Sequence, residues 1–257
     1  MNSYRAVGLG FVLVVLLSCS VNGDEQMQGS PLIPVQHYSG YQLPGLLKEH
    51  VDVKKLADVS TLLDMEWYAT FILVHPGSSD KTLSLSSCAQ LKLYAEYTLT
   101  TLNERDNVAF MEIMLMCKVT DMLIDARPAE RSFIGTLMLD AQSPNQLPAQ
   151  VALVISESES QRLLNDSDIK TWADINKDIA VKSSNVTKAS YVHDAGEQEL
   201  EWIAKGDFNH DGFEDLMFSS RDAVSGGSYA ATRLFVVTKR SANSEIQMLH
   251  LWPNVLN

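Results

Sequence analysis

Short apolar runs of strand length recur along the last part of the chain, separated by Gly, Asn, Asp and Ser. Within these runs apolar and polar residues tend to alternate, which is the pattern of a strand with one face in a core. Sequential strands joined by short loops favour an antiparallel meander. We therefore predict strands in DIAVKS, ASYVHDA, LEWIAKGD, EDLMFSS, ATRLFVVTK and IQMLHLW.

The stretch from about 47 to 135 shows mostly the periodicity of a helix. In LLKEHVDVKKLADV, apolar residues recur at turn spacing, which indicates an amphipathic segment. The β-rich run WYATFILV that follows predicts a buried strand, which Pro76-Gly77 ends.

Two further helices are predicted to form a helical hairpin. One runs from Cys88 to about Leu102 with Ser86-Ser87 as its cap, and the other from Asn107 to about Ile124 with Asp106 as its cap. The second helix is apolar nearly all round because it is rich in Met, Leu and Ile. This favours a helix buried in the core, and an adaptable groove for a partner is the alternative.

The fold class that these patterns predict is α+β. LPAQVALVIS fits a strand or a helix, and SESESQRLLNDSDIKTWADI fits surface helix and loop. We expect a mainly helical region over residues 47–147, then a mainly β region over 148–257 that ends in the antiparallel sheet. Position 147/148 need not be a true domain boundary.

The start of the chain, MNSYRAVGLGFVLVVLLSCS, has the features of an export signal. One Arg precedes an apolar run that is too short to span a bilayer comfortably. The ending LLSC resembles the lipobox of bacterial lipoproteins, in which the signal is cleaved before a cysteine that is then acylated. The resemblance implies a signal peptide over 1–18, a lipid on Cys19 and attachment to a membrane through that lipid. An ordinary cleaved signal is the alternative.

The predicted cellular location is the bacterial cell envelope. Ser20 after the cysteine resembles lipoproteins that are sent on to the outer membrane, where the protein would face the periplasm or the cell surface. Residues 19–46 mix Gly, Pro, Ser and Gln without sustained periodicity, so we expect a tether there.

Cysteine usage agrees with export. With Cys19 consumed by lipid, Cys88 and Cys117 are left as an even pair in an oxidising compartment. Two antiparallel helices could bring these cysteines close, so we predict a disulfide between them. Two buried thiols are the alternative.

The charge balance argues against one class of partner. The formal net charge is -12, from 32 acidic and 20 basic residues, and no basic run interrupts it. Such a surface repels a phosphate backbone, so nucleic acid is not an expected partner.

The stretch GDFNHDGFEDL places oxygen-bearing side chains on alternate residues. Calcium takes about six to eight oxygens, and a tight loop supplies them from alternate positions. Gly212 permits the sharp turn that such a loop needs. We therefore expect a Ca²⁺ site formed by Asp207, Asn209, Asp211, the Phe213 carbonyl and Asp215.

The spacing resembles the loop D-x-[DN]-x-D-G-x-x-D-[IL] of FG-GAP and VCBS-type repeats, which lies between two strands. The resemblance implies that Asp215 is a direct ligand, but a single copy implies no propeller. It differs from an EF-hand loop, because Phe218 stands where a bidentate Glu is required. A polar turn without an ion is the alternative. For a bound ion, a bracing role is favoured over chemistry, because saturated protein ligation leaves no open position.

Catalytic motifs are not evident. The 6 histidines form no HExxH spacing, and no GxSxG elbow, phosphate loop or SxxK occurs. His193-Asp194 is interpreted as a turn at a strand end rather than as a catalytic pair.

Taken with the anchor, these features predict a calcium-binding envelope lipoprotein that acts as a non-catalytic protein-binding module. An inhibitor, an immunity factor and an assembly factor are examples, each with a protein partner. One alternative is a hydrolase of envelope polymers that uses two acidic residues as acid and base. Another is a purely structural envelope component.

Overall fold

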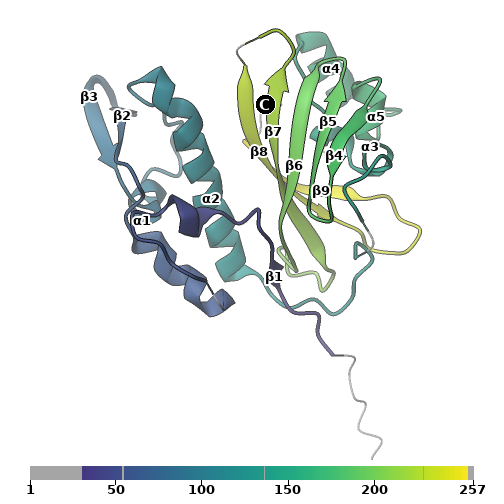
Figure 1. Ribbon diagram of the computed structural model, residues 1–257, viewed down its shortest axis with the longest axis horizontal. Helices are drawn as coiled ribbons and strands as arrows, with labels where there is room; N and C mark the ends of the chain where they lie inside the picture. Colours follow the sequence, from purple (N-terminus) through teal and green to yellow (C-terminus); the bar gives the residue numbers. More distant parts are fainter. Residues whose placement is uncertain (1–30, 54, 136, 228, 254–257) are drawn as a thin grey trace, which may run out of the picture. The chain divides into compact units, whose positions relative to one another are not determined.

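The β region forms an antiparallel sheet whose strands follow the order of the sequence. The computed structural model describes residues 31–253, with gaps at 54, 136 and 228. Each strand pairs with the next in the order β4-β5-β6-β7-β8-β9 (Figure 1). The predicted meander and its strands are confirmed: β4 Ala180–Ser184, β5 Lys188–His193, β6 Gly196–Gly206, β7 Asp215–Val224, β8 Ala230–Thr238 and β9 Gln247–Trp252.

Both faces of this sheet are covered. On one face Leu200 and Phe218 belong to a core that includes residues from the segment 134–175. On the other face Ile203 and Met217 belong to a core shared with the helical region. Burial on both faces explains why β8 contains the continuous apolar run LFVV instead of strict alternation.

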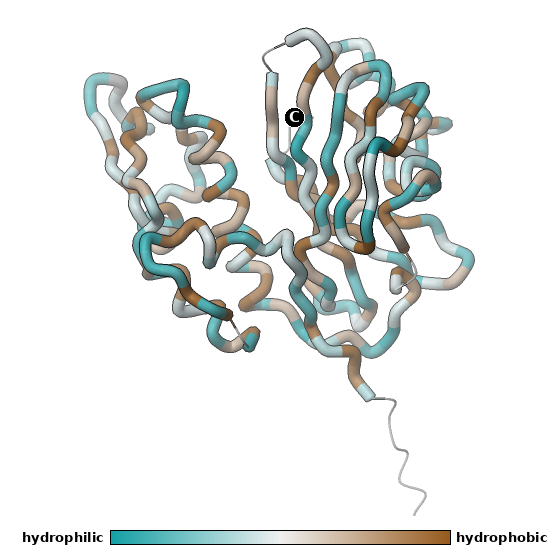
Figure 2. The backbone as a smooth tube through the Cα atoms, viewed as in Figure 1, coloured by the Kyte–Doolittle hydropathy of each residue, from teal (hydrophilic) through white to brown (hydrophobic). Residues whose placement is uncertain are grey.

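The longest helix, α2 (Asn107–Asp125), lies in that second core. It contacts β8 and a 3₁₀ helix, η2 (Leu56–Asp64), and its apolar residues are marked in Figure 2. Phe110, Ile113 and Leu123 are fully buried. The prediction of a buried core helix is confirmed, since neighbours on more than one side cover it.

The predicted helical hairpin is wrong. Helix α1 extends only over Cys88–Lys92, and a 3₁₀ turn, η3 (Glu104–Asp106), precedes α2. Between them the backbone pairs with strand β2 (Phe71–His75), where the Leu102 N–H donates to the Ile72 carbonyl at 2.8 Å. Threonine is frequent in this segment and favours extended backbone, so strand pairing replaces the expected helix.

Of the two predicted helix N-caps, the one before α1 is confirmed and the one before α2 is wrong. The Ser87 hydroxyl accepts a hydrogen bond from the Gln90 N–H at 3.3 Å, so this cap is confirmed. Asp106 makes no capping hydrogen bond, because it already lies within η3 with helical backbone angles. The Asn103 side chain caps that turn instead, accepting from the Arg105 N–H at 3.2 Å.

The predicted strand Trp67–Val74 begins later, at Phe71, and is half of a hairpin. Its partner is β3 (Ser78–Leu85), which the sequence did not predict. The β3 sequence SSDKTLSL is mostly polar, with Leu83 and Leu85 packed on the core. One apolar pair is too weak a pattern to reveal a strand.

The expected amphipathic segment LLKEHVDVKKLADV is not a continuous helix. Short 3₁₀ helices, η1 (Leu43–Leu46) and η2, lie at its two ends. Between them the Lys48 N–H donates to the Glu66 carbonyl at 2.8 Å, so the backbone finds a partner outside any helix.

The described part of the expected tether packs on the rest of the protein. Strand β1 (Gln36–His37) pairs with β6, Ile33 pairs with Ala129, and Leu43 is fully buried. Residues 31–46 are therefore part of the folded body and not a free spacer. The signal peptide, Cys19 and the first part of the tether lie outside the described residues.

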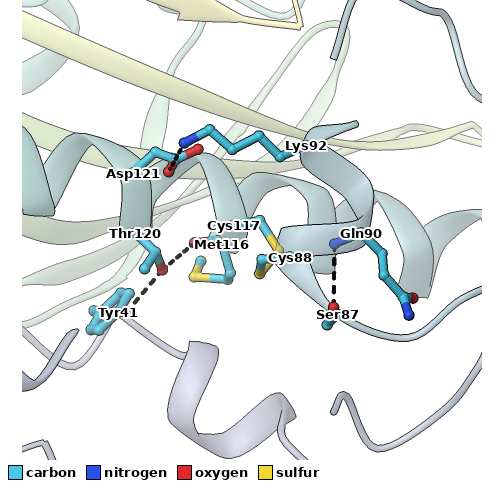
Figure 3. Close-up of a disulfide and its surroundings, with 9 residues drawn as sticks. All are labelled: Tyr41, Ser87, Cys88, Gln90, Lys92, Met116, Cys117, Thr120 and Asp121. Carbon is cyan, nitrogen blue, oxygen red and sulfur yellow. Dashed lines mark hydrogen bonds and ion pairs between the residues drawn. A yellow bond between two sulfur atoms is a disulfide. The ribbon is translucent and has the colours of Figure 1, made fainter. Parts of the chain in front are cut away.

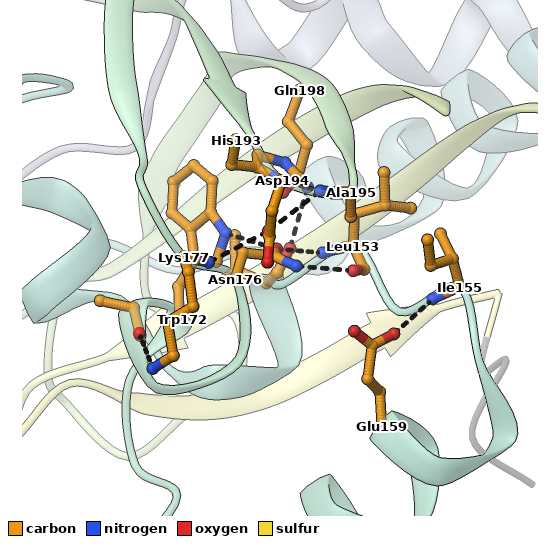
Figure 4. Close-up of polar contacts among 12 residues, drawn as sticks. Leu153, Ile155, Glu159, Trp172, Asn176, Lys177, His193, Asp194, Ala195 and Gln198 are labelled. Carbon is orange, nitrogen blue, oxygen red and sulfur yellow. Dashed lines mark hydrogen bonds and ion pairs between the residues drawn. The ribbon is translucent and has the colours of Figure 1, made fainter. Parts of the chain in front are cut away.

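The sheet face that carries Leu200 and Phe218 is covered by the segment 134–175, which contains short helices. LPAQVALVIS contains a 3₁₀ turn, η4 (Ala149–Val151), in place of a strand or α-helix. The buried Asn176 amide oxygen accepts from the Leu153 N–H at 2.9 Å and from the Trp172 indole at 3.0 Å (Figure 4). The α-helices of this layer are α3 Ser143–Gln146, α4 Glu157–Asn165 and α5 Trp172–Ile175.

The predicted disulfide is confirmed. Cys88 at the start of α1 is bonded to Cys117 in the middle of α2, with their Cα atoms 5.4 Å apart (Figure 3). Both cysteines are buried. The bond ties a five-residue helix to the core helix.

Candidate metal centre

The acidic loop, residues 207–215, connects β6 to β7. Gly206 and Asp215 are partners at the end of the β6–β7 ladder, so the loop starts and ends at the same level of the sheet. Its turn uses left-handed backbone at His210 (φ 62°) and Gly212 (φ 84°). Glycine adopts that conformation without strain, as the sequence pattern requires.

Backbone N–H groups of the loop bind its own carboxylates. Asp207 accepts from the Asp211 N–H at 3.1 Å and from the Gly212 N–H at 2.9 Å. Asp211 accepts from the Phe213 N–H at 3.0 Å. These bonds fold the loop around its acidic side chains, as in an Asx-type turn.

Asp215, the first residue of β7, is fully buried. Its Oδ2 accepts from the Phe208 N–H at 3.0 Å, whereas its Oδ1 has no hydrogen-bond partner among the described residues. Burial raises the pKa of Asp215 to about 6; the nearby Thr238 hydroxyl and the Phe208 N–H oppose this rise, and the charges of Asp211 and Asp207 add to it.

The pKa of Asp215 has a consequence for stability. It is higher in the folded chain than the ordinary value near 3.9, so the group favours folding when it is protonated, below about pH 4. That contribution is lost as the pH rises through about 6. The difference corresponds to about 3 kcal/mol. At neutral pH the ionised carboxylate therefore lacks a compensating positive charge.

Asp211 already has such a charge beside it. Its Oδ2 accepts from Arg240 Nη2 at 2.9 Å and Arg240 Nε at 3.1 Å, and from Asn209 Nδ2 at 3.1 Å. Burial alone would raise the pKa of Asp211, but the hydrogen bonds from the Phe213 N–H and Arg240 hold it below its usual range.

The structure thus brings the five predicted ligands into one loop without closing them into a metal cage. Within the described residues, no group of three or more His, Cys, Asp or Glu side chains is arranged to hold a metal ion. The unpaired Oδ1 of Asp215 fits a cation, and the Asp211–Arg240 pair competes with one. A bound ion would require Asp211 to turn from Arg240 towards the loop.

The acidic loop also holds the segment that leaves α2. Arg127 and Asp207 exchange backbone hydrogen bonds at 3.0 and 2.9 Å, and the Gly212 carbonyl accepts from the Glu130 N–H at 2.9 Å. The Ser132 hydroxyl donates to Glu214 at 2.6 Å. The loop therefore joins the helical region to the sheet, a role that no local pattern in the sequence indicated.

A second polar cluster lies inside the molecule. The buried Arg233 donates to Asp222 Oδ2 at 2.6 Å, and Gln198 donates to Asp222 Oδ1 at 2.9 Å. Arg233 also donates to carbonyls of the η4 segment, including Val151 at 2.9 Å. These polar residues occupy strand positions that face the core, which is the one signal by which the sequence could have revealed them.

His193, the last residue of β5, lies beside this cluster. Its Nδ1 is 3.7 Å from Asp194, whose carboxylate accepts from the Ala195 and Lys177 N–H groups at 2.9 and 3.1 Å (Figure 4). Burial lowers the pKa of His193, although Asp194 and Gln198 oppose that shift. The interpretation of His193-Asp194 as a turn is confirmed, because Asp194 and Ala195 form the β5–β6 turn.

Comparison of the chain with known protein families, with curated proteins and with solved structures finds no match. No helix in the described part of the chain has the length and apolar character needed to cross a membrane.

Proposed function

We propose that this protein is a calcium-binding lipoprotein of the bacterial cell envelope that acts as a non-catalytic protein-binding module. The observation that carries the calcium proposal is the buried, unpaired Oδ1 of Asp215 beside two further carboxylates. A buried carboxylate without a partner is costly, and Ca²⁺ both supplies charge and takes oxygen ligands. The ion would be held by Asp207, Asn209, Asp211, the Phe213 carbonyl and Asp215.

Calcium binding would replace one contact of the loop by another. Arg240 now neutralises Asp211, and its side chain is 49% exposed. An exposed ion pair of this kind contributes at most about 1 kcal/mol, so the guanidinium can turn to solvent at little cost. Asp211 is then free to join Asp215 and Asp207 at the ion.

The ion would act as a brace. The loop carries the backbone contacts to Arg127 and Glu130, so closing it around a cation fixes the connection between α2 and the sheet. Protein oxygens from five residues leave little room for a substrate at the ion. This geometry favours a structural role over catalysis.

The envelope address rests on the lipobox-like LLSC and on the disulfide. Cys19 would carry the lipid, and Ser20 favours the outer membrane, with the body in the periplasm or at the cell surface. A structural disulfide such as Cys88–Cys117 persists where the surroundings are oxidising, which suits that address.

Asp215→Asn is expected to raise stability in chelator and to abolish the stabilisation that calcium gives the parent. In chelator the variant should be more stable than the parent at pH 7.5, by up to about 3 kcal/mol, because a buried unpaired charge is removed. With calcium at about 100 times its Kd the parent should gain about 2.7 kcal/mol and the variant almost nothing. Urea denaturation of the full chain in calcium and in EGTA measures both changes.

Asp194→Asn is the matched control, since it makes the same substitution in the β5–β6 turn. Its calcium-induced gain should equal that of the parent. Equal stability of the parent in calcium and in EGTA would contradict the proposed calcium site.

A defined protein partner is expected to copurify with the tagged full-length chain from detergent extracts of cross-linked envelopes. The Cys19→Ser variant lacks the proposed lipid acceptor, so it should leave the membrane fraction yet still bind the purified partner. Repeated recovery of no specific protein, or hydrolysis of an envelope polymer by the purified chain, would contradict the binding-module proposal.

A further inference from the structure

A cleft of about 610 Å³ opens between four segments of the chain. Phe133, Ile134 and Leu137 form part of its wall together with α3, and α5 with the loop before it and the β8–β9 connection form the rest. Its volume is in the range of sites that hold small molecules or short peptide segments. None of the residues assigned to the acidic loop lines it.

Four of the polar side chains around this cleft are without partners in the described part of the chain. Asn145, Gln146, Asp168 and Lys239 line it, and within the described part of the chain their side chains make no hydrogen bond or ion pair. Within the described residues one ion pair crosses the cleft, in which Lys170 lies 3.7 Å from a carboxylate of the β8–β9 connection. Hydrogen-bond donors and acceptors, and side chains of both charges, therefore line the same cleft.

We term the apolar part of the lining the floor of the cleft, because it is the more buried part. Ile134 and Leu137 are almost fully buried, and Phe133 and Ile246 are partly buried beside them. An apolar floor under a polar rim is the usual make-up of a ligand site, in which the floor supplies affinity and the rim fixes orientation.

Contacts of the lining residues hold the walls of the cleft. The Phe133 ring lies 6.0 Å from the ring of Phe213 in the acidic loop. On the other side Thr171 donates to Asp174 in the capping box of α5. The cleft is thus preformed, which lowers the entropy cost of binding.

We infer that this cleft binds a peptide segment that carries an apolar side chain flanked by an acidic and a basic residue. The inference rests on the proposed function, because that segment would belong to the protein partner. The side-chain amides of Asn145 and Gln146 offer the donor and acceptor that a peptide group needs. Lys239 and Asp168 match flanking charges of opposite sign, and the floor receives the apolar side chain.

Other occupants match the lining less well. Two lysines face three carboxylates, those of Asp168, Asp174 and Glu245, so a phosphate-rich ligand is not favoured. A neutral oligosaccharide would leave Lys239 and Asp168 unmatched. A peptide with both charges satisfies each of them.

Selection of random dodecapeptides displayed on phage against the immobilised full-length chain is expected to enrich an apolar residue flanked by Asp or Glu and by Lys or Arg. Enriched peptides should bind Lys239→Glu at least about tenfold more weakly than the parent by fluorescence anisotropy. Exchanging the acidic residue of the peptide for Lys should restore much of that loss. Lys182→Glu, the same charge reversal on β4 outside the cleft, should bind like the parent.

Three outcomes would overturn the inference: no enriched peptide, equal affinity of the parent and Lys239→Glu for the enriched peptides, or binding of neutral oligosaccharides that Lys239→Glu leaves unchanged. A copurified partner that binds Lys239→Glu as tightly as it binds the parent would refute binding of the partner in the cleft and would leave the proposed function intact. Failure to recover any partner would instead count against the proposed function.

Discussion

Asp222→Ala is expected to lower the free energy of unfolding by about 3 to 5 kcal/mol. The side chains of Asp222 and Arg233 are 1% and 6% exposed, and they pair at 2.6 Å. Removing the carboxylate leaves the guanidinium buried with only the carbonyls of the η4 segment as partners. It also leaves the Gln198 amide without one acceptor. Urea denaturation followed by circular dichroism measures the loss.

Two comparisons isolate the cause of this loss. Lys182→Ala breaks the exposed Lys182–Glu197 pair, where the side chains are 60% and 45% exposed, and should cost no more than about 1 kcal/mol. Replacing both partners, with Asp222→Leu and Arg233→Met, should recover much of the stability because no buried charge is left. A loss below about 1 kcal/mol for Asp222→Ala would contradict the argument.

This buried pair shows a limit of sequence patterns. Gln198, Asp222 and Arg233 lie on three adjacent strands, and Asp222 and Arg233 come together only when β7 and β8 pair. Alternation predicted the strands because a period of two is set locally along the backbone. It could not predict that polar residues on the inward face would satisfy one another.

The helical region shows a second limit. The segment after α1 has a helical pattern, yet the edge of β2 offers its backbone partners at Ile72 and Val74, and strand pairing prevails. Local propensity is weak compared with tertiary contacts of this kind. The disulfide was nevertheless predicted, because an even pair of cysteines in a chain expected to be exported indicated it, although the antiparallel helices expected to bring the pair together are wrong.

The acidic loop was predicted in part. Its alternating oxygens and its glycine lie within nine residues, so a local pattern contains them. Arg240 lies 29 residues beyond Asp211, and Arg127 lies on the segment after α2, so neither is visible in that pattern. The sequence therefore indicated the loop. The Arg240 guanidinium, which competes for Asp211, and the segment after α2 that the loop holds can be seen only in the folded structure.

Loss of the Cys88–Cys117 bond is expected to lower the free energy of unfolding by about 3 to 4 kcal/mol. The cross-link spans 29 residues, and closing a loop of this size restricts the unfolded chain strongly. The double variant Cys88→Ala and Cys117→Ala removes the bond without leaving a free thiol. Its urea midpoint, compared with that of the parent, measures the effect.

The destabilisation caused by losing the disulfide should be greatest around α1, because α1 has only five residues and is too short to be stable alone. Besides packing on the core, its other contacts include the Ser87 cap and an exposed ion pair between Lys92 and Asp121 at 2.9 Å (Figure 3). Amide hydrogen exchange should therefore accelerate first around α1 in the double variant, while protection in β6 and β7 persists. Lys92→Ala, which removes only the ion pair, is the control and should cost at most about 1 kcal/mol. Unchanged exchange around α1 would show that packing alone holds this helix on α2.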